Sequence, residues 1–179
     1  MTKPDGKSRD EDRALADKSQ VEQMLADHAG MLWRIASIYE ADPELRKELH
    51  QEILVAAWRA VPRFRGEASV RTFLARIAHI RSVSHVARQA ARPRHTPIDP
   101  QAPSPAASPY DEAEQSDRRS RLLAAVRDLP LAWRQPIVLT LEGFAPREIG
   151  EVLGLSANVV SIRLTRAKHA LRQSLKEPS

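Results

Sequence analysis

The side chains best suited to binding chemistry in this sequence are arginines gathered between residues 59 and 92. The stretch holds one acidic residue, Glu67, and eight arginines: Arg59, Arg63, Arg65, Arg71, Arg76, Arg81, Arg88 and Arg92. Phe64 and Phe73 lie among them. Guanidinium groups fork onto phosphates, and aromatic rings stack unpaired bases. The mixture predicts contact with single-stranded nucleic acid; the alternative is a solvated arginine face over core rings, and for Phe73 we favour the core.

A second basic segment, from Ala145 to Lys176, has the pattern of two helices joined by a tight turn. Pro146 suits a first helical turn, Gly154 supplies a stop, and Ser156 can cap the next helix. The second helix carries five Lys or Arg residues and no acid before Glu177. A helix-turn-helix with a basic second helix places that helix in the DNA major groove. The alternative is a basic helical hairpin with a solvated face.

Apolar spacing separates a buried face of this second helix from an exposed one. The apolar stripe comprises Val160, Leu164, Ala167, Leu171 and Leu175. At about 100° per residue, the opposite face comprises Asn158, Ile162, Thr165 and His169, flanked by Ser161 and Arg166. A thymine methyl group is a natural partner for the exposed Ile162. Arg163 lies nearer the buried edge, which suits a phosphate or structural contact.

The elements that position these residues are all expected to be helices. Spacing predicts one amphipathic helix from about Gln20, one from Pro43 with Asp42 as its cap, and one from about Val70 to Arg88. The last of these is expected to bury one stripe, which includes Phe73, Leu74, Ile77 and Ile80 and can extend to Val83. The sequence therefore predicts an all-α fold: two small helical domains joined by an extended proline-rich linker, the second a helix-turn-helix domain.

Composition sets the expected boundaries. Residues 1–18 have balanced charge and little to bury, so we expect a disordered N-terminus. Residues 19–92 form the first helical domain, and residues 118–179 form the helix-turn-helix domain. Residues 93–117 hold six of the 13 prolines and an excess of acidic side chains, which is typical of an extended, acidic linker.

Composition also narrows the function. The 179 residues carry a formal net charge of +5 with a pI near 10.0, which favours a polyanionic partner. The absence of cysteine excludes disulfides and cysteine-bound zinc, and the histidines lack metal-ligand spacing, so no metal or cofactor is expected. We find no catalytic nucleophile–base set or phosphate-binding loop, so we do not expect an enzyme. Without a signal peptide or membrane insertion, a cytoplasmic protein is expected.

The order of these parts resembles an alternative RNA polymerase sigma factor of the extracytoplasmic-function (ECF) type, in the sigma-70 family. The segment ELHQEILVAAWRAVPRFRGEASVRTFLARIAH is similar to the family's polymerase-binding helix and promoter-melting loop and helix. The segment VRDLPLAWRQPIVLTLEGFAPREIGEVLGLSANVVSIRLTRAK is similar to the module that reads the −35 promoter element. The resemblance, over about residues 22–92 and 119–176, implies a promoter-specificity subunit with residues 19–92 as region 2 and 118–179 as region 4.

The resemblance also implies roles for matching residues. Core RNA polymerase would contact Glu48, Gln51 and Glu52, whereas Leu49 and Trp58 would lie in the core. Melted −10 DNA would meet Arg63, Phe64, Arg65, Glu67, Arg71, Arg76 and Arg81. The −35 duplex would meet Asn158, Ser161, Ile162, Arg163, Thr165, Arg166 and Lys168. The implied partners are core RNA polymerase, promoter DNA and, as the family's usual inhibitor, an anti-sigma factor.

Two places depart from the family pattern. Arg46 and Lys47 stand where acidic residues are usual, so we hypothesise that polymerase docking is altered there. Ile80 and Ser84 stand where an Asn and an Asp often occur, so those two roles do not carry over.

Other classes of function stay open. A stand-alone helix-turn-helix regulator would use its first domain for dimerisation or ligand binding and would bind duplex DNA tightly without polymerase. A regulator that occupies polymerase, or sequesters a partner, without reading DNA would tolerate alanine at Thr165 and Arg166.

Overall fold

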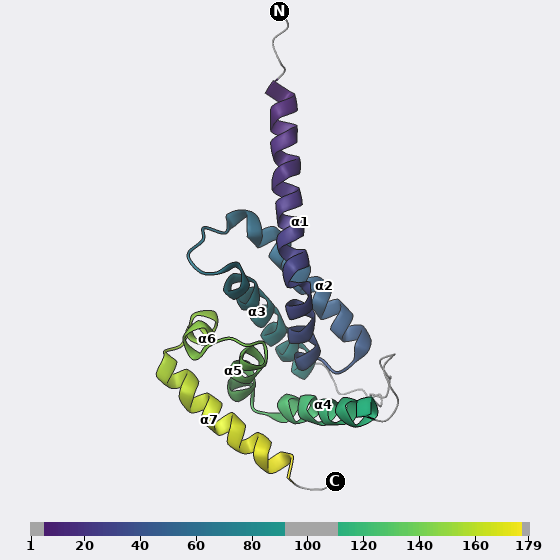
Figure 1. Ribbon diagram of the computed structural model, residues 1–179, viewed down its shortest axis with the longest axis vertical. Coiled ribbons are helices and arrows are strands. Elements are labelled where there is room, and N and C mark those ends of the chain that lie inside the picture. Colours follow the sequence, from purple (N-terminus) through teal and green to yellow (C-terminus); the bar gives the residue numbers. More distant parts are fainter. Residues whose placement is uncertain (1–5, 92–110, 177–179) are drawn as a thin grey trace, which may run out of the picture.

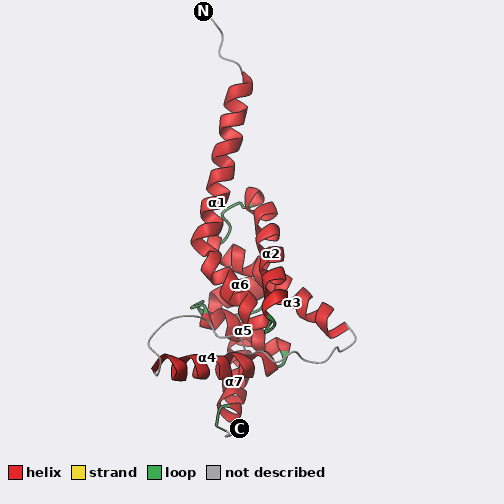
Figure 2. Cartoon of the chain, turned by 90° about the vertical axis from the view of Figure 1, so that its right-hand side faces the viewer, coloured by secondary structure: helices red, strands yellow, loops and turns green. Residues whose placement is uncertain are grey.

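The structure, a computed structural model, describes the backbone of residues 6–91 and 111–176 and the side chains of residues 19–91 and 117–176. Every regular element in those ranges is a helix (Figure 2), as the predicted all-α fold requires. The N-terminal domain contains α1 (Gly6–Tyr39), α2 (Pro43–Ala60), the 3₁₀ turn η1 (Val61–Arg63) and α3 (Val70–Ala91). The C-terminal domain contains α4 (Asp111–Asp128), α5 (Leu131–Leu141), α6 (Pro146–Leu153) and α7 (Ala157–Ser174).

The N-terminal domain is a bundle in which α1, α2 and α3 each pack against the other two. Its fully buried side chains include Leu32, Ile35, Leu49, Ile53 and Leu74. Burying a side chain of this size contributes about 1.5–3 kcal/mol. The predicted start of α2 is confirmed: the Asp42 carboxylate accepts the N–H groups of Glu44 and Leu45, both at 2.9 Å, and Pro43 opens the helix.

The buried face of α3 differs from the predicted stripe. Leu74 is buried, but Ile80 is 54% exposed, and Phe73 and Ile77 are only partly buried. The buried residues of α3 are mostly small or polar: Thr72, Leu74, Ala75, Ala78, His79, Ser82 and His85. The prediction failed because it counted apolar residues and gave no weight to histidine or serine.

The buried histidines of α3 are accommodated by polar partners at the end of α1. The Tyr39 hydroxyl lies 3.4 Å from Nδ1 of His79, and a Glu40 carboxylate oxygen lies 2.7 Å from Nε2 of His85. Burial lowers the pKa of His79 to about 4, so the ring is neutral near pH 7. The contact between α1 and α3 is therefore partly polar, although it lies inside the bundle.

Helices extend past two of the predicted boundaries. α1 begins at Gly6 and projects beyond the rest of the protein (Figure 1), so residues 6–18 are helical where disorder was expected. This stretch has no proline, and a helix nucleated on the packed residues from Val21 onward propagates through it at little cost. α4 begins at Asp111, inside the predicted linker, because no proline follows Pro109 until Pro130. Residues 1–5 of the predicted disordered N-terminus and residues 93–110 of the predicted linker lie outside the described residues, as does Arg92.

The C-terminal domain packs α5, α6 and α7 together, with α4 against α5 and α7. α6 ends at Gly154, which adopts φ of +68°, and the Ser156 hydroxyl caps α7 by accepting the N–H of Val159 at 3.4 Å. The α7 stripe is buried as predicted at Val160, Leu164, Ala167 and Leu171, whereas Leu175, just beyond the helix, is exposed. One face of α7 is thereby fixed inward, and the opposite face is left to solvent.

The two domains lie in direct contact (Figure 1). α3 packs against α6, and α1 contacts both α4 and α5. The segment between α5 and α6, residues 142–145, sits at the centre of this contact. The pocket described in the next subsection is therefore lined by side chains from both domains.

The turn between α6 and α7 depends on Gly150. A Cβ atom placed there would lie 2.6 Å from the backbone carbonyl oxygen of Leu155, which cannot move aside as a side chain could. We expect Gly150→Ala to destabilise the C-terminal domain by about 1–3 kcal/mol, measured by urea unfolding followed by circular dichroism. Glu151→Ala, on the exposed side of the same turn of helix, is the control and should change stability by less than about 0.5 kcal/mol. Equal stability of the two variants would contradict this account.

Candidate nucleic-acid interface

The loop between η1 and α3 carries the residues predicted to hold an unpaired base. Gly66 adopts φ of +75°, a left-handed conformation that glycine takes without strain. The Ser69 hydroxyl accepts the N–H of Thr72 at 3.0 Å and so caps the start of α3. The rings of Phe64 and Phe73 pack with their centroids 4.8 Å apart. Phe73 thus packs against Phe64 and restricts its position, and both rings are partly exposed.

A pocket of about 630 Å³ opens beside this aromatic pair. Its lining residues are Arg63, Phe64, Arg65, Glu67, Ala68, Thr72, Phe73, Arg76 and Glu151. A volume of roughly 300–1,000 Å³ suits a small molecule, so a nucleotide base can enter. An aromatic ring with three arginines around it can stack a base and hold the flanking phosphates.

The pocket brings together five of the seven residues predicted to meet −10 DNA: Arg63, Phe64, Arg65, Glu67 and Arg76. The structure separates the other two from them. Arg81 is exposed on a different side of α3, since about 100° per residue turns it about 140° away from Arg76. Arg71 reaches toward the C-terminal domain. The predicted arginines therefore do not form one continuous face.

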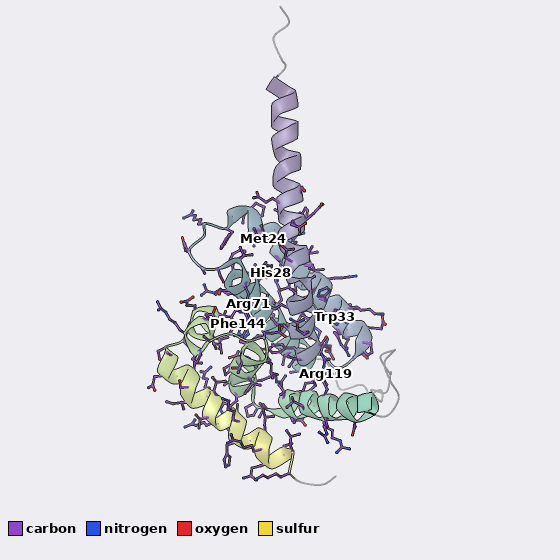
Figure 3. The ribbon with its side chains drawn as sticks, viewed as in Figure 1. Met24, His28, Trp33, Arg71, Arg119 and Phe144 are labelled. Atoms are coloured by element: carbon purple, nitrogen blue, oxygen red, sulfur yellow. The ribbon has the colours of Figure 1, made fainter. Side chains whose placement is uncertain are left out.

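The contact made by Arg71 joins the two domains. Its Nη2 donates to the backbone carbonyl of Glu142, and its guanidinium carbon lies 3.9 Å from the centre of the Phe144 ring. Figure 3 shows Arg71 and Phe144 next to each other where α3 meets the segment between α5 and α6. A cation against an aromatic ring contributes about 0.5–2 kcal/mol.

Glu142 has a second partner in the N-terminal domain. Nε of Arg34 lies 3.0 Å from Oε1 of Glu142, and Nη2 of Arg34 lies 2.8 Å from Oε2, which is a two-pronged ion pair. The Glu142 side chain is only 5% exposed. The hydrogen bond to Glu142 raises the pKa of Arg34, although partial burial opposes this. This pair could not be predicted from sequence, because its members are 108 positions apart.

Other arginines serve as structural caps rather than as free cations. Arg127 of α4 donates to the Ser37 carbonyl near the end of α1 at 2.7 Å, which is a further contact between the domains. Arg134 donates to the Leu129 carbonyl at 3.1 Å, just after α4. Burial lowers the pKa of Arg127, and the nearby positive charge of Arg46 lowers it further. These guanidinium groups neutralise the carbonyl ends of helices.

The residues predicted to meet −35 DNA lie along α7. Six of them are exposed: Asn158, Ser161, Ile162, Thr165, Arg166 and Lys168. Arg163 is half-buried, at the edge of the core stripe, as its position predicted. The Thr165 hydroxyl donates to the Ser161 carbonyl at 2.9 Å within the helix, which leaves its methyl group for an outside contact. The exposed side of α7 is therefore a basic surface with an apolar patch at Ile162.

The outer face of α2 includes two residues that the sequence analysis missed. Glu48 and Gln51 are exposed as expected, whereas Glu52 pairs with Arg88 of α3 at 2.7 Å. Val55 and Trp58 are exposed and follow Gln51 at helical spacing on the same side. Placing Trp58 in the core was wrong, since five residues separate it from the buried Ile53 and turn it about 140° away. We call Glu48, Gln51, Val55 and Trp58 the outer α2 face.

The two unusual basic residues of α2 lie away from this face or are neutralised. Arg46 is half-buried, and its Nη2 donates to the Ala41 carbonyl at 2.6 Å. Lys47 pairs with Glu44 at 2.8 Å on the surface. Neither residue presents a free cation next to Glu48.

Two further classes of site are absent from the described residues. No group of three or more His, Asp or Glu side chains there could hold a metal ion. In the same part of the chain, no helix is both long enough and apolar enough to cross a membrane.

Comparisons with known proteins find sigma factors among the relatives of this chain. The family model for sigma-70 region 2 matches residues 24–92, which span most of the N-terminal domain. The probable RNA polymerase sigma-C factor of Mycobacterium bovis is 28% identical over 148 residues, which cover 78% of this chain and 75% of that protein. The ECF RNA polymerase sigma factor SigC of Mycobacterium tuberculosis matches to the same extent.

Two solved structures have the same fold. CnrH, in complex with the cytosolic domain of CnrY, matches with a TM-score of 0.67 and 24% identity over 93% of this chain and 96% of that chain. The sigma factor RpoE, in complex with the anti-sigma factor NepR from Bartonella quintana, matches with a TM-score of 0.70 and 18% identity over 88% and 98%. The similarity covers both domains and not only the N-terminal one.

The aromatic wall of the pocket can be tested directly. If Phe64 stacks on a base, Phe64→Leu should weaken binding of a fluorescein-labelled single-stranded dT oligonucleotide by roughly 5- to 150-fold, because one stacked base contributes about 1–3 kcal/mol. Phe64→Tyr keeps an aromatic ring and should retain binding. The measurement is fluorescence anisotropy at fixed salt. Equal affinities of the Leu and Tyr variants would show that the ring does not stack.

Proposed function

Because this chain is a relative of the extracytoplasmic-function RNA polymerase sigma factors, with a sigma-70 region 2 domain at residues 24–92, we propose that it directs core RNA polymerase to specific promoters. The observation that carries the proposal is the pocket beside Phe64, where an aromatic ring and three arginines of that domain line a space large enough to admit a base. The N-terminal domain then acts as region 2 and captures an unpaired base of the −10 element. Arg63, Arg65 and Arg76 hold the flanking phosphates.

The C-terminal domain acts as region 4 and reads the −35 duplex. α7 enters the major groove with Ser161, Ile162, Thr165 and Arg166 toward the bases. Ile162 meets a thymine methyl, and Arg166 can fork onto a guanine. Asn158, Arg163 and Lys168 lie at the margins of this surface, where phosphates pass.

The outer α2 face is the surface that docks on core polymerase. It combines two polar residues, Glu48 and Gln51, with two exposed apolar ones, Val55 and Trp58. Interfaces of this composition have an aromatic anchor surrounded by polar groups. Glu52 has a smaller part in docking because Arg88 already engages its carboxylate.

We also propose that an anti-sigma factor restrains this chain. The support is the fold shared with RpoE, which was solved in complex with the anti-sigma factor NepR, and with CnrH, which was solved in complex with the cytosolic domain of CnrY.

The function is tested by mixing purified protein with core RNA polymerase. We expect co-purification with core and run-off transcription from a promoter that core alone does not use. A chain that fails to bind core contradicts the proposal. A stand-alone regulator would instead bind specific duplex DNA tightly without polymerase, and a regulator that does not read DNA would keep its activity with alanine at Thr165 and Arg166.

The docking surface can be tested with two matched tryptophans. Trp58 and Trp33 are 37% and 39% exposed, but Trp33 lies on α1 with its ring against His50. Trp58→Ala should weaken binding to core about 30-fold, the effect of losing an anchor worth about 2 kcal/mol. Trp33→Ala should change it less than about threefold. Affinity is measured by titrating core with fluorescently labelled chain, and equal losses in the two variants would reject the outer α2 face as the docking site.

A further inference from the structure

Ile80 is an exposed apolar residue on the outer side of α3. It is 54% exposed, although isoleucine is one of the residue types most often buried. α3 reaches the core of the bundle through other side chains, among them Leu74, Ala75 and Ala78, so the fold does not depend on Ile80. A single exposed apolar residue is common on protein surfaces and by itself indicates no function. Any function of Ile80 must follow from its surroundings.

Ile80 lies just beyond the rim of the pocket beside Phe64. Arg76 is the lining residue furthest along α3, and Ile80 follows it by four residues, which is about 6 Å along the helix and about 40° around it. Measured from Phe73, seven residues earlier, Ile80 is about 10 Å along the helix and only about 20° out of line. Phe73, Arg76 and Ile80 therefore lie on one side of α3, in the order of pocket wall, pocket rim and open surface.

The surface around Ile80 attracts phosphates. α3 carries four arginines and no acidic residue. Two of the four, Arg71 and Arg88, are engaged by other residues of the chain. The other two, Arg76 and Arg81, are exposed, form no ion pair within the described part of the chain, and lie on either side of Ile80 around the helix. A strand that leaves the pocket can therefore place its phosphates on these two guanidinium groups, with a base over Ile80.

The distance from the pocket fits a nucleotide close to the captured base. Neighbouring stacked bases are about 3.4 Å apart along one strand, so the separation of about 6–10 Å corresponds to no more than roughly three nucleotides. The Ile80 side chain has no hydrogen-bonding group and can distinguish bases only by apolar contact. The C5 methyl group of thymine is the apolar group that a base edge offers, and the other three bases lack it. Thymine is therefore the base that Ile80 can select.

A protein partner fits this surface less well. A docking site for a protein has several apolar residues at its centre, as the outer α2 face has with Val55 and Trp58. The exposed residues one helical turn before and after Ile80 are Arg76 and Ser84, which are both polar. A lone apolar side chain beside cations suits a polyanion that carries a methyl group, which is the kind of contact proposed above for α7.

We propose that Ile80 is a specificity-determining residue for single-stranded DNA, and that it contacts the C5 methyl group of a thymine within about three nucleotides of the base held beside Phe64. The proposal rests on the proposed function, because it needs a strand to enter that pocket. Arg76 and Arg81 hold the strand without selecting a base, and Ile80 makes the chain prefer thymine at this position. Deoxyuridine, which differs from thymidine only by the missing methyl group, loses the contact.

The test removes the methyl group from the DNA and the apolar side chain from the protein in turn. Fluorescein-labelled oligo(dT) and oligo(dU) of equal length are titrated with the full chain at fixed salt, and fluorescence anisotropy gives both dissociation constants. The wild-type chain should bind oligo(dT) about fourfold more tightly than oligo(dU), which is the effect of burying one methyl group. Ile80→Ala should bind the two equally. Ile80→Val keeps a branched apolar side chain and should retain most of the preference.

Two further variants separate this role from others. Leu175→Ala removes an apolar side chain of similar exposure, 49%, from the end of the C-terminal domain and should keep the full preference. Phe64→Leu should weaken binding of both oligonucleotides and leave their ratio nearly unchanged, because the ring stacks on either base. A wild-type chain without the preference, or a preference that survives in Ile80→Ala, overturns the inference while the pocket stands. A wild-type chain that binds neither oligonucleotide contradicts the pocket as well.

Discussion

The two-pronged pair between Arg34 and Glu142 fixes how the halves of this protein sit together. The carboxylate is almost fully buried, and its backbone carbonyl is held by Arg71 at the same time. Without Arg34 the buried carboxylate would lack its cation, which is unfavourable away from water. The position of α6, the approach of Glu151 to the pocket beside Phe64 and the cover over Arg71 all follow from this anchoring. The buried apolar side chains of the two domains belong to one cluster, so the pair adds a directional contact to apolar packing between them.

The arginines of this chain have two different roles: the more buried ones make structural hydrogen bonds, and the exposed ones can bind a ligand. Arg46, Arg127 and Arg134 donate to carbonyls near helix ends, where they satisfy polar groups that would otherwise be unpaired. Arg63, Arg65 and Arg76 are exposed around the pocket and keep their donors for a ligand. Arg71 belongs to neither class, since its present partner is a carbonyl that DNA could replace. A high count of arginine therefore overstates the DNA-binding surface.

Local patterns were predictable from the sequence, and contacts between distant parts were not. The Asp42 cap, the stop at Gly154 and the stripe from Val160 to Leu171 depend on a few neighbouring residues, so spacing and capping chemistry were enough. The buried face of α3 was misjudged because His79 and His85 are hidden through polar partners on α1. Trp58 was assigned to the core although its angular position on α2 turns it away from the buried Ile53. Glu142 and Glu151 could not be found from sequence, since their roles exist only once the two domains meet.

The central claim is that this chain places core polymerase on a promoter, for which its two domains, in contact here, must part to reach the −10 and −35 elements that lie apart on the DNA. The chain has no cysteine, so spin labels can be attached at Ser84→Cys on α3 and Gln173→Cys on α7, two exposed positions away from the contact. The most direct measurement is the distance between these labels by double electron–electron resonance. We expect one short, narrow distribution in the free chain and a clearly longer one with core polymerase and promoter DNA. A distribution that is already long and broad in the free chain, or that stays short in the complex, would contradict the account.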